Sequence, residues 1–318
     1  MYPLLLKAPI KDYLWGGTRL KTEFGFKTEK EIAAEAWVLS CHKDGSNVVA
    51  NGEQKGKTLP EVLDVWGKEA IGQKAAEFSY FPLLIKLIDA KQKLSVQVHP
   101  DDEYALKVEG EYGKTEMWYV VDCDEGARLI YGFSEDISKE EFESRIKDNT
   151  LTQVCNFVPV NKGDVFFISA GTLHAIGEGI LIAEVQQNSN TTYRVSDYGR
   201  LGADGKPREL HIEKALDVTE CKKPTIAYGQ VGEITKLGNN TLRELASCDL
   251  FKASVLELCD SIEICEKESF VSLVVLDGEL TVKWEENEIN AKKGDSIFVP
   301  ANFKVNLIGK AQILCSKV

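Results

Sequence analysis

The sequence lacks any apolar run long enough to cross a membrane, and its first residues lack the apolar core of a secretion signal. Leu4 to Leu6 form a short apolar stretch, but Lys7, Lys11 and Asp12 follow almost at once. We therefore expect a cytoplasmic protein that has no membrane partner.

Paired cysteine motifs are missing as well. The eight cysteines are scattered between Cys41 and Cys315, and they form neither a CxxC motif nor a tight framework. This pattern is typical of reduced thiols in the cytoplasm, where cysteine behaves mostly as a small core residue. The cysteines therefore support the cytoplasmic prediction.

Basic blocks are also absent, although the chain is rich in charge. The 38 lysines and arginines face 50 aspartates and glutamates, which gives a formal net charge of -12. A nucleic acid would be repelled by this excess of negative charge, so we expect no nucleic-acid partner. A small anion is still a possible substrate, because one phosphate needs only two or three well-placed cations.

The chain has the size and composition of a globular protein with about two domains, since 318 residues are 43% hydrophobic and 28% charged. A Thr-Leu-Pro-Glu start predicts a helical segment over about 58–78, with a break near Gly72. A capping box formed by Ser138 and Glu141 predicts a second helix over about 138–148. Short β-branched and aromatic runs between turn residues fill most of the remainder, which predicts a mainly β barrel or sandwich with inserted helices.

An internal echo indicates two related β-domains. Residues 162–170 are KGDVFFISA and residues 293–301 are KGDSIFVPA, so a Gly-Asp turn is followed each time by a short apolar strand. His174 follows the first copy, whereas Val305 stands at the equivalent place after the second. We expect polar chemistry in the first domain alone.

Polar side chains share one face of a predicted strand in the segment LSVQVHPDD. Alternation places Ser95, Gln97 and His99 together, and the same rule places Lys114 beside Glu116 on a later strand. With His174 added, the candidates Gln97, His99, Glu116 and His174 offer two imidazoles, a carboxylate and an amide oxygen, which suit a zinc-like divalent ion. Taken singly, each is equally well interpreted as a capped, half-buried or surface residue.

Three cations form a second group of candidates. Arg194 and Arg200 lie in the polar, turn-rich segment TTYRVSDYGR, which we interpret as a loop over a site. Lys86 lies inside the apolar strand FPLLIKLID, where an ammonium is costly unless it reaches a partner or a cavity. The alternative for each is a solvated ion pair or a side chain that extends to the surface.

These segments resemble the type I mannose-6-phosphate isomerase family. The stretch 81–102, FPLLIKLIDAKQKLSVQVHPDD, is similar to the family signature, in which a lysine strand precedes a Ser-x-Gln-x-His-Pro-Asp motif. Further similar segments, in the family order, are WGG at 15–17, EAWVLSCH at 35–42, KTEMWYV at 114–120, GTLHAIG at 171–177 and the stretch to Arg194. The resemblance covers about the first 210 residues.

The resemblance implies a mainly β fold of two cupin-type jelly-roll barrels with a few inserted helices. We expect a catalytic N-terminal barrel over 1–225 and a C-terminal barrel over 226–318 without metal ligands. The chain lacks the large helical domain of longer members, so it resembles the compact bacterial form. A monomer or a homodimer is compatible with this resemblance.

The resemblance also implies an activity and its residues: reversible isomerisation of mannose 6-phosphate to fructose 6-phosphate through an enediol, with one zinc ion per chain. The implied zinc ligands are Gln97, His99, Glu116 and His174, the catalytic residues are Arg194 and Lys114, and the residues around the phosphosugar are Ser95, Lys86 and Arg200. Arg200 stands where longer relatives have lysine. The general base is left open.

Two other functions compete with this one. Cupin barrels also house oxygen-using iron enzymes, for which two histidines and one carboxylate are a common ligand set. Gln97 and the three cations argue against that class, since dioxygen needs no cations. A non-catalytic sugar-binding or storage protein is the second alternative, and the presence of all four ligand candidates argues against it.

Overall fold

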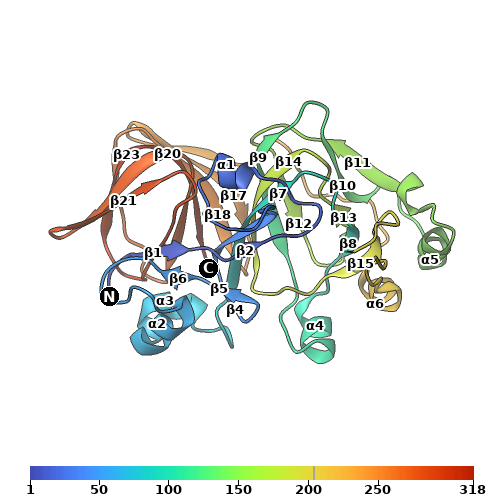
Figure 1. Cartoon of the computed structure of the whole chain (residues 1–318), viewed down its shortest axis with the longest axis horizontal. Coiled ribbons are helices and arrows are strands. Elements are labelled where there is room, and N and C mark those ends of the chain that lie inside the picture. The colour runs from blue at the N-terminus through green and yellow to red at the C-terminus, as the bar shows by residue number, and fades with distance from the viewer. Residues whose placement is uncertain (203–204) are drawn as a thin grey trace.

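A computed structural model of the chain describes residues 1–202 and 205–318. It shows a mainly β protein in which a two-sheet sandwich lies beside a long, curved ten-stranded sheet (Figure 1). None of the described helices is long and apolar enough to cross a bilayer.

The sandwich consists of a six-stranded and a five-stranded sheet. The strands of the six-stranded sheet, in spatial order, are β12 (Val165–Ile168), β9 (Glu116–Cys123), β14 (Ile180–Gln187), β7 (Leu83–Ala90), β3 (Glu35–Leu39) and β2 (Ile10–Lys11). Those of the five-stranded sheet are β11 (Cys155–Pro159), β10 (Arg128–Phe133), β13 (His174–Ala175), β8 (Val96–Val98) and β15 (Tyr193–Ser196). All of the pairings are antiparallel.

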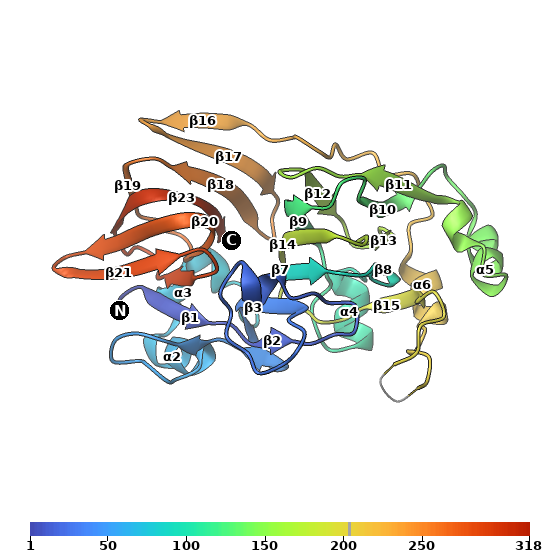
Figure 2. The same ribbon diagram turned by 45° about the horizontal axis from the view of Figure 1, so that its top comes forward.

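The ten-stranded sheet combines the C-terminal part of the chain with two short N-terminal strands. Its main path is β16 (Ile234–Leu237), β17 (Asn240–Ser247), β18 (Lys252–Leu258), β23 (Val305–Lys317), β20 (Val271–Trp284), β22 (Ser296–Val299), β1 (Leu4–Lys7) and β6 (Val48–Val49). Two further strands pair at the side of this path: β19 (Ser261–Ile264) with β23, and β21 (Asn287–Lys292) with β20. Figure 2 shows β1 next to the C-terminal strands, so the N-terminus is built into the second sheet system.

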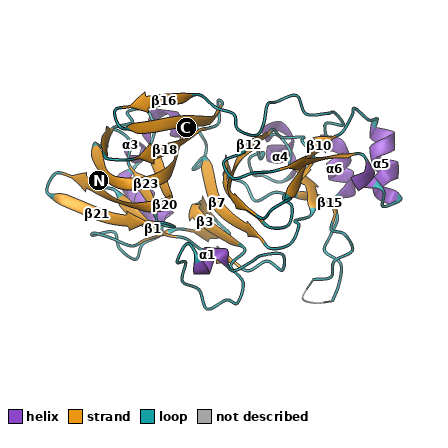
Figure 3. Ribbon diagram, turned by 90° about the horizontal axis from the view of Figure 1, so that it is seen from above, coloured by secondary structure: helices purple, strands orange, loops and turns teal. Residues whose placement is uncertain are grey.

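The helices are short and lie outside the sheets. They are α1 (Arg19–Thr22), α2 (Leu59–Trp66), α3 (Lys68–Ala75), α4 (Asp102–Val108), α5 (Lys139–Lys147) and α6 (Ile212–Val218), with a 3-10 turn at Leu151–Gln153 and a small hairpin of β4 (Cys41–His42) and β5 (Gly45–Ser46). Seen from above, α5 and α6 lie at the far end of the sandwich (Figure 3).

The predicted helix over 58–78 is divided into α2 and α3, and the break predicted near Gly72 is present as a kink inside α3, where the φ of Gly72 is 82°. Thr58 and Glu61 form the capping box that begins α2, as the Thr-Leu-Pro-Glu start indicates. Gly67, with a φ of 72°, ends α2 and precedes α3, because glycine adopts a left-handed conformation without steric cost. At the second predicted helix, Ser138 accepts a hydrogen bond from the backbone N–H of Glu141 and caps α5.

Alternate side chains of β14 pack into two different hydrophobic cores. In β14 the side chains of Leu181, Ala183 and Val185 pack into a cluster that joins the six-stranded to the ten-stranded sheet. Ile180 and Ile182, on the opposite face, pack between the two sheets of the sandwich. β14 is buried on both faces, which explains why its first four residues, Ile180 to Ala183, are all apolar. A polar residue on its inner face, such as Glu184, lies in the interior of the sandwich.

Candidate metal centre

Three predicted ligands meet inside the sandwich. The Nε2 atoms of His99 and His174 lie 3.1 Å apart, and Glu116 places one carboxylate oxygen 3.6 Å from the former and the other 3.5 Å from the latter. All three side chains are at most 1% exposed. They are the one group of three potential ligand residues that the described part of the chain brings within 4.8 Å.

Strand register explains how residues so far apart in sequence converge. His174 on β13 is directly opposite Gln97 on β8, and His99 comes just after that strand ends. Glu116 begins β9 in the facing sheet, where it pairs with Ile168 of β12. The ligand group is therefore assembled across the sandwich from both sheets.

Backbone carbonyls fix the tautomers of both histidines. Nδ1 of His99 lies 3.0 Å from the carbonyl oxygen of Thr191, and Nδ1 of His174 lies 2.9 Å from that of Thr172. A carbonyl oxygen only accepts, so each Nδ1 donates and each neutral ring keeps its lone pair on Nε2. The two lone pairs face each other, an arrangement that is repulsive unless a cation lies between them.

Glu116 adds a buried carboxylate to these two lone pairs. Neither of its carboxylate oxygens has a well-aligned hydrogen-bond donor among the described residues, although the ammonium of Lys114 lies 2.8 Å from Oε2. The same ammonium lies 3.1 Å from Nε2 of His99. A buried carboxylate next to two imidazole lone pairs is the donor set that a divalent ion requires, so these residues fit a metal.

Gln97 and Ser95 border the same group. The amide nitrogen of Gln97 lies 3.4 Å from Nε2 of His174, and the hydroxyl of Ser95 donates to the Gln97 amide oxygen at 3.3 Å. The structure therefore brings together all four of the residues that the sequence offered as ligands. Lys114 and Glu116 also lie side by side, as alternation predicted.

Lys86 does not extend to the surface. Its side chain is 5% exposed, and its ammonium lies 3.0 Å from the carboxylate of Glu184, which is directly opposite on β14. Glu184 also accepts a hydrogen bond of 2.9 Å from the indole of Trp118. Glu184 was not among the predicted residues, although a single acid inside the apolar run ILIAEV was a signal for it.

Burial and neighbouring charges set the protonation states of this interior. Burial, reinforced by the charge of Glu184, raises the pKa of Glu116 to about 7. Burial acts in the same direction on Glu184, but the ammoniums of Lys114 and Lys86 overcome it and hold the pKa of Glu184 at about 2. Burial lowers the pKa of His174 to about 3, so this imidazole stays neutral and available as a ligand.

A cavity of about 270 Å³ lies against the group. Its wall includes Ser95, Gln97 and Lys114 from the metal side, and the ion pair of Lys86 and Glu184. Arg194, Arg208 and Thr192 also line the cavity. A small molecule in this cavity would touch both the ligand group and several cations.

The two arginines from the sequence analysis have different positions. Arg194 lines the cavity, donates to the carbonyl of Glu209 at 2.9 Å, and keeps a buried Nε without a partner among the described residues. Arg200 does not line it, since its guanidinium pairs with Asp197 and donates to the carbonyl of Lys93. Arg208, which the sequence analysis did not select, pairs with the same Asp197 and reaches the cavity.

Comparison with known proteins identifies the family of the chain. Residues 4–125 match the phosphomannose isomerase type I catalytic domain, and residues 241–318 match the mannose-6-phosphate isomerase cupin domain. A mannose-6-phosphate isomerase of Streptococcus mutans is 40% identical over 304 residues, which are 95% of this chain and 93% of that protein. The chain belongs to the type I phosphomannose isomerase family.

Other members of the type I phosphomannose isomerase family match along nearly the whole chain. Mannose-6-phosphate isomerase ManA of Bacillus subtilis is 38% identical over 316 residues, covering 99% of this chain and 98% of its own. A crystal structure of the mannose 6-phosphate isomerase from Bacillus subtilis matches with a TM-score of 0.91 and 35% identity, with full coverage of both chains. Family membership confirms the resemblance and the mainly β fold with a cupin domain.

Proposed function

We propose that the chain interconverts D-mannose 6-phosphate and D-fructose 6-phosphate and that its metal is zinc, one ion per chain. The observation that carries this proposal is the pair of opposed Nε2 lone pairs beside the Glu116 carboxylate, next to a cavity that cations line. Relatives that match almost all of this chain are mannose-6-phosphate isomerases, which supports the choice of substrate.

Gln97, His99, Glu116 and His174 are the proposed zinc ligands. Turning the Gln97 amide by half a turn about its last torsion exchanges its oxygen and nitrogen, so the oxygen faces His174 and the nitrogen faces Ser95. Two imidazoles, a carboxylate and an amide oxygen form a mixed nitrogen and oxygen set without thiolates. An ion held there would polarise a carbonyl or hydroxyl oxygen of the sugar as a Lewis acid.

Arg194 and Lys114 are the proposed catalytic residues. In the isomerisation a proton leaves C2, its electron pair forms the C1–C2 double bond of an enediol, and a proton returns to C1. Negative charge develops on the sugar oxygens, and the guanidinium of Arg194, which lines this cavity, would stabilise it. The Lys114 ammonium is suited to exchange the proton between those oxygens.

Ser95, Lys86 and the arginines on Asp197 are the proposed substrate-binding residues. Ser95 and Lys86 line the cavity next to the ligand group, where they would contact the sugar hydroxyls. Arg208 is our choice for the phosphate contact because it reaches the cavity. Arg200 would act through Asp197, which both guanidiniums share.

The finer architecture is also a proposal. We assign two cupin-type jelly-roll barrels to 1–225 and 226–318, with β1 and β6 crossing over to the second sheet system. Val305 is 1% exposed inside an apolar cluster of the ten-stranded sheet, which supports a second barrel without metal ligands. A cytoplasmic location and a monomer or homodimer complete the proposal, and the free state of all eight cysteines supports the location.

An oxygen-using iron enzyme is the competing function that shares the two histidines and the carboxylate. The cations on the cavity wall disfavour it, because dioxygen carries no charge whereas a sugar phosphate is an anion. Elemental analysis of the purified protein and an isomerase assay coupled to NADPH formation separate the two. Stoichiometric zinc with turnover of mannose 6-phosphate supports the proposal, while bound iron and oxygen consumption without isomerisation would overturn it.

A further inference from the structure

His211 lies outside the metal centre and contacts the backbone of Arg194. β15, which carries Arg194, is the last strand of the five-stranded sheet, so the backbone groups on its outer edge need partners other than a strand of that sheet. The backbone N–H of His211 donates to the carbonyl of Arg194 at 2.8 Å, and the backbone N–H of Arg194 donates to Nδ1 of His211 at 3.3 Å. One residue, which directly precedes α6, therefore bonds both backbone polar groups of Arg194.

The side chain of Arg194 is bonded to the same segment. Its Nη1 donates to the carbonyl of Glu209, two residues before His211, at 2.9 Å. The segment 209–211 thus contacts the arginine on its guanidinium as well as on its backbone. Because Arg194 lines the cavity beside the metal ligands, these contacts decide where its guanidinium lies in relation to a bound sugar.

The bond to Arg194 requires one particular form of the His211 ring. A backbone N–H can only donate, so Nδ1 accepts with its lone pair and the proton of the neutral ring is on Nε2. This Nε2 lies 3.9 Å from the carboxylate of Glu209. Protonation would place a second N–H on Nδ1, opposite the N–H of Arg194, and the hydrogen bond would be lost. The bond is therefore present only while the ring is neutral.

The surroundings of His211 favour the neutral ring. Burial lowers the pKa of His211 below its ordinary value of 6.5, and the charges of Arg194 and Lys214 act in the same direction. The carboxylates of Glu209 and Glu109 oppose this shift, but the pKa is lowered overall. His211 is therefore a hydrogen-bond acceptor at neutral pH.

We propose that His211 is a positioning residue, which holds Arg194 in its catalytic orientation through the hydrogen bond that the neutral ring accepts, so that protonation of the ring lowers turnover. This inference rests on the proposed catalytic role of Arg194. The arginine acts on charge that develops in the transition state, so a misplaced guanidinium lowers kcat more than it raises KM. His211 does not line the cavity, and its effect on the sugar is exerted through Arg194.

Two substitutions separate the acceptor from the ring. In His211→Asn the side-chain oxygen takes about the place of Nδ1 and keeps an acceptor for Arg194. In His211→Phe the acceptor is lost, but a ring is kept against Tyr193, whose centroid lies 6.1 Å from that of the imidazole. With the zinc-loaded full chain and mannose 6-phosphate, we expect His211→Phe to lower kcat about tenfold and His211→Asn to keep it within about twofold. Equal kcat values of the two variants, or a loss confined to KM, would overturn the inference.

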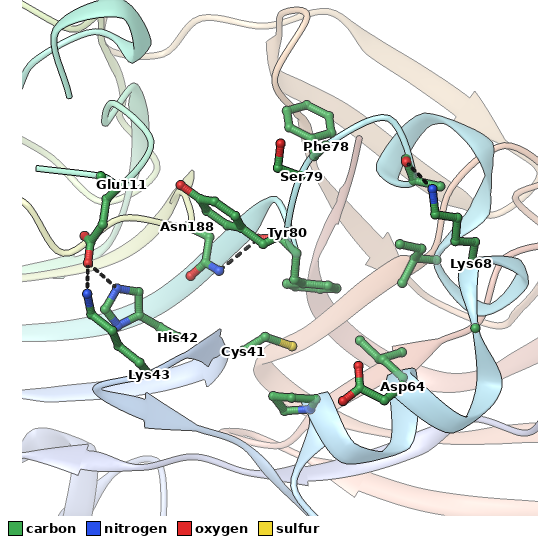
Figure 4. A pocket seen from close by; sticks show the side chains of 17 residues that line it. Cys41, His42, Lys43, Asp64, Lys68, Phe78, Ser79, Tyr80, Glu111 and Asn188 are labelled. Atoms are coloured by element: carbon green, nitrogen blue, oxygen red, sulfur yellow. Dashed lines mark hydrogen bonds and ion pairs between the residues drawn. The ribbon is translucent and has the colours of Figure 1, made fainter. Parts of the chain in front are cut away.

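His42 provides a matched control in another part of the molecule. Its Nδ1 also accepts a backbone N–H, that of Asp44 at 3.1 Å, and its ring packs against Trp37 with 5.8 Å between the centroids. Figure 4 shows His42 beside Glu111 on the wall of a separate cavity, and among the described residues none lines both this cavity and the one beside the metal ligands. We expect His42→Phe to leave kcat within about twofold of the unmodified chain. A loss as large as that of His211→Phe would contradict a specific role of His211.

The ratio of kcat between the unmodified chain and His211→Asn isolates the protonation of His211. The other titrating groups, including Glu116 and the phosphate of the substrate, are common to both proteins, so their effects cancel in the ratio. Because the pKa of His211 lies below 6.5, we expect the ratio to be constant above pH 6.5 and to fall several-fold towards about pH 5. A ratio that stays constant over this whole range would refute the dependence on protonation.

Nitrogen-15 NMR of the full chain tests the ring without any turnover, since comparison with His211→Asn assigns the ring signals of His211. We expect a neutral ring with its proton on Nε2 at neutral pH, and a proton on Nδ1 would overturn the inference. An unmodified chain that binds zinc but does not convert mannose 6-phosphate would refute the proposed function and, with it, the role of Arg194. An active chain in which His211→Phe and His211→Asn have the same kcat would refute this inference alone.

Discussion

Replacing Glu184 by glutamine would leave the ammonium of Lys86 buried without its main counter-charge. The two side chains are 3% and 5% exposed, and the ion pair of 3.0 Å joins opposed positions on neighbouring strands. Glutamine has nearly the same shape, and its amide oxygen keeps the bond from the indole of Trp118. The substitution therefore removes one negative charge and turns an amide nitrogen, which is a donor, towards the Lys86 ammonium.

The expected cost follows from the burial of the pair. Removing one partner of a buried ion pair costs about 3–5 kcal/mol, because the remaining charge has lost its solvent and its counter-ion. Glu35 also stabilises the Lys86 ammonium, and the ammonium lies 5.6 Å from the ring centre of Trp37. These two contacts place the expected loss near the lower value, at about 3 kcal/mol.

Urea unfolding of the metal-free protein, followed by tryptophan fluorescence, measures this loss. Glu141→Gln is the matched control, since it breaks an exposed pair with Arg145 of nearly the same length, 2.9 Å, for which we expect at most about 0.5 kcal/mol. The double substitution Lys86→Met, Glu184→Gln should recover most of the stability. The reasoning is refuted if Glu184→Gln costs no more than Glu141→Gln.

Three further predictions concern pH, metal and substrate. The pKa of Glu184 in the folded protein is about 2, which is below its ordinary value of 4.5. Its ionised carboxylate therefore stabilises the fold fully above pH 4.5, and this stabilisation is lost as the pH falls towards 2. The stability difference between the unmodified protein and Glu184→Gln should shrink between pH 4.5 and 2, and a constant difference would contradict the prediction. His174→Ala should leave circular dichroism unchanged but reduce bound zinc several-fold by elemental analysis, and full zinc content would exclude His174 as a ligand. Arg208→Ala should raise the KM for mannose 6-phosphate at least about tenfold in steady-state kinetics, and Arg200→Ala should raise it less. A larger increase in KM for Arg200→Ala would assign the phosphate contact to Arg200 instead.

Strand alternation is a local rule, so it predicted that some of the candidate ligands lie on one face. The segment LSVQVH places Gln97 and His99 on one face, and the structure brings that face opposite His174. Alternation along a strand does not predict which sheets pack against each other. Whether Glu116 faced solvent or His99 depended on which sheets stack, and this is a property of the assembled sandwich.

The role of Lys86 could not be decided from its own strand. An apolar strand with one lysine is compatible with a side chain that reaches the surface, and only the pairing of β7 with β14 reveals Glu184 as its partner. A single acid in the run ILIAEV was an equivalent signal, since both strands are too apolar to carry an unpaired charge. Considering the two runs together would have predicted the ion pair.

The positions of the arginines and the pairing of the N-terminal strand could not be predicted from local sequence patterns. Arg200 and Arg208 share Asp197, and which one reaches the cavity depends on the path of a turn-rich loop that follows no simple periodicity. The echo of KGDVFFISA and KGDSIFVPA suggested two related β-domains, and the boundary between them stays a prediction. In the structure β1 pairs with β22, because the Leu4 to Leu6 stretch covers an apolar edge of the other sheet system.

The central claim is that two imidazoles and a carboxylate inside the sandwich hold one divalent ion. Anomalous diffraction from crystals of zinc-loaded protein, collected on both sides of the zinc edge, tests it most directly. We predict a single strong peak bounded by Nε2 of His99, Nε2 of His174 and the Glu116 carboxylate, with the Gln97 oxygen completing the set. A map without a peak between these atoms, or with its only peak elsewhere, would contradict the account.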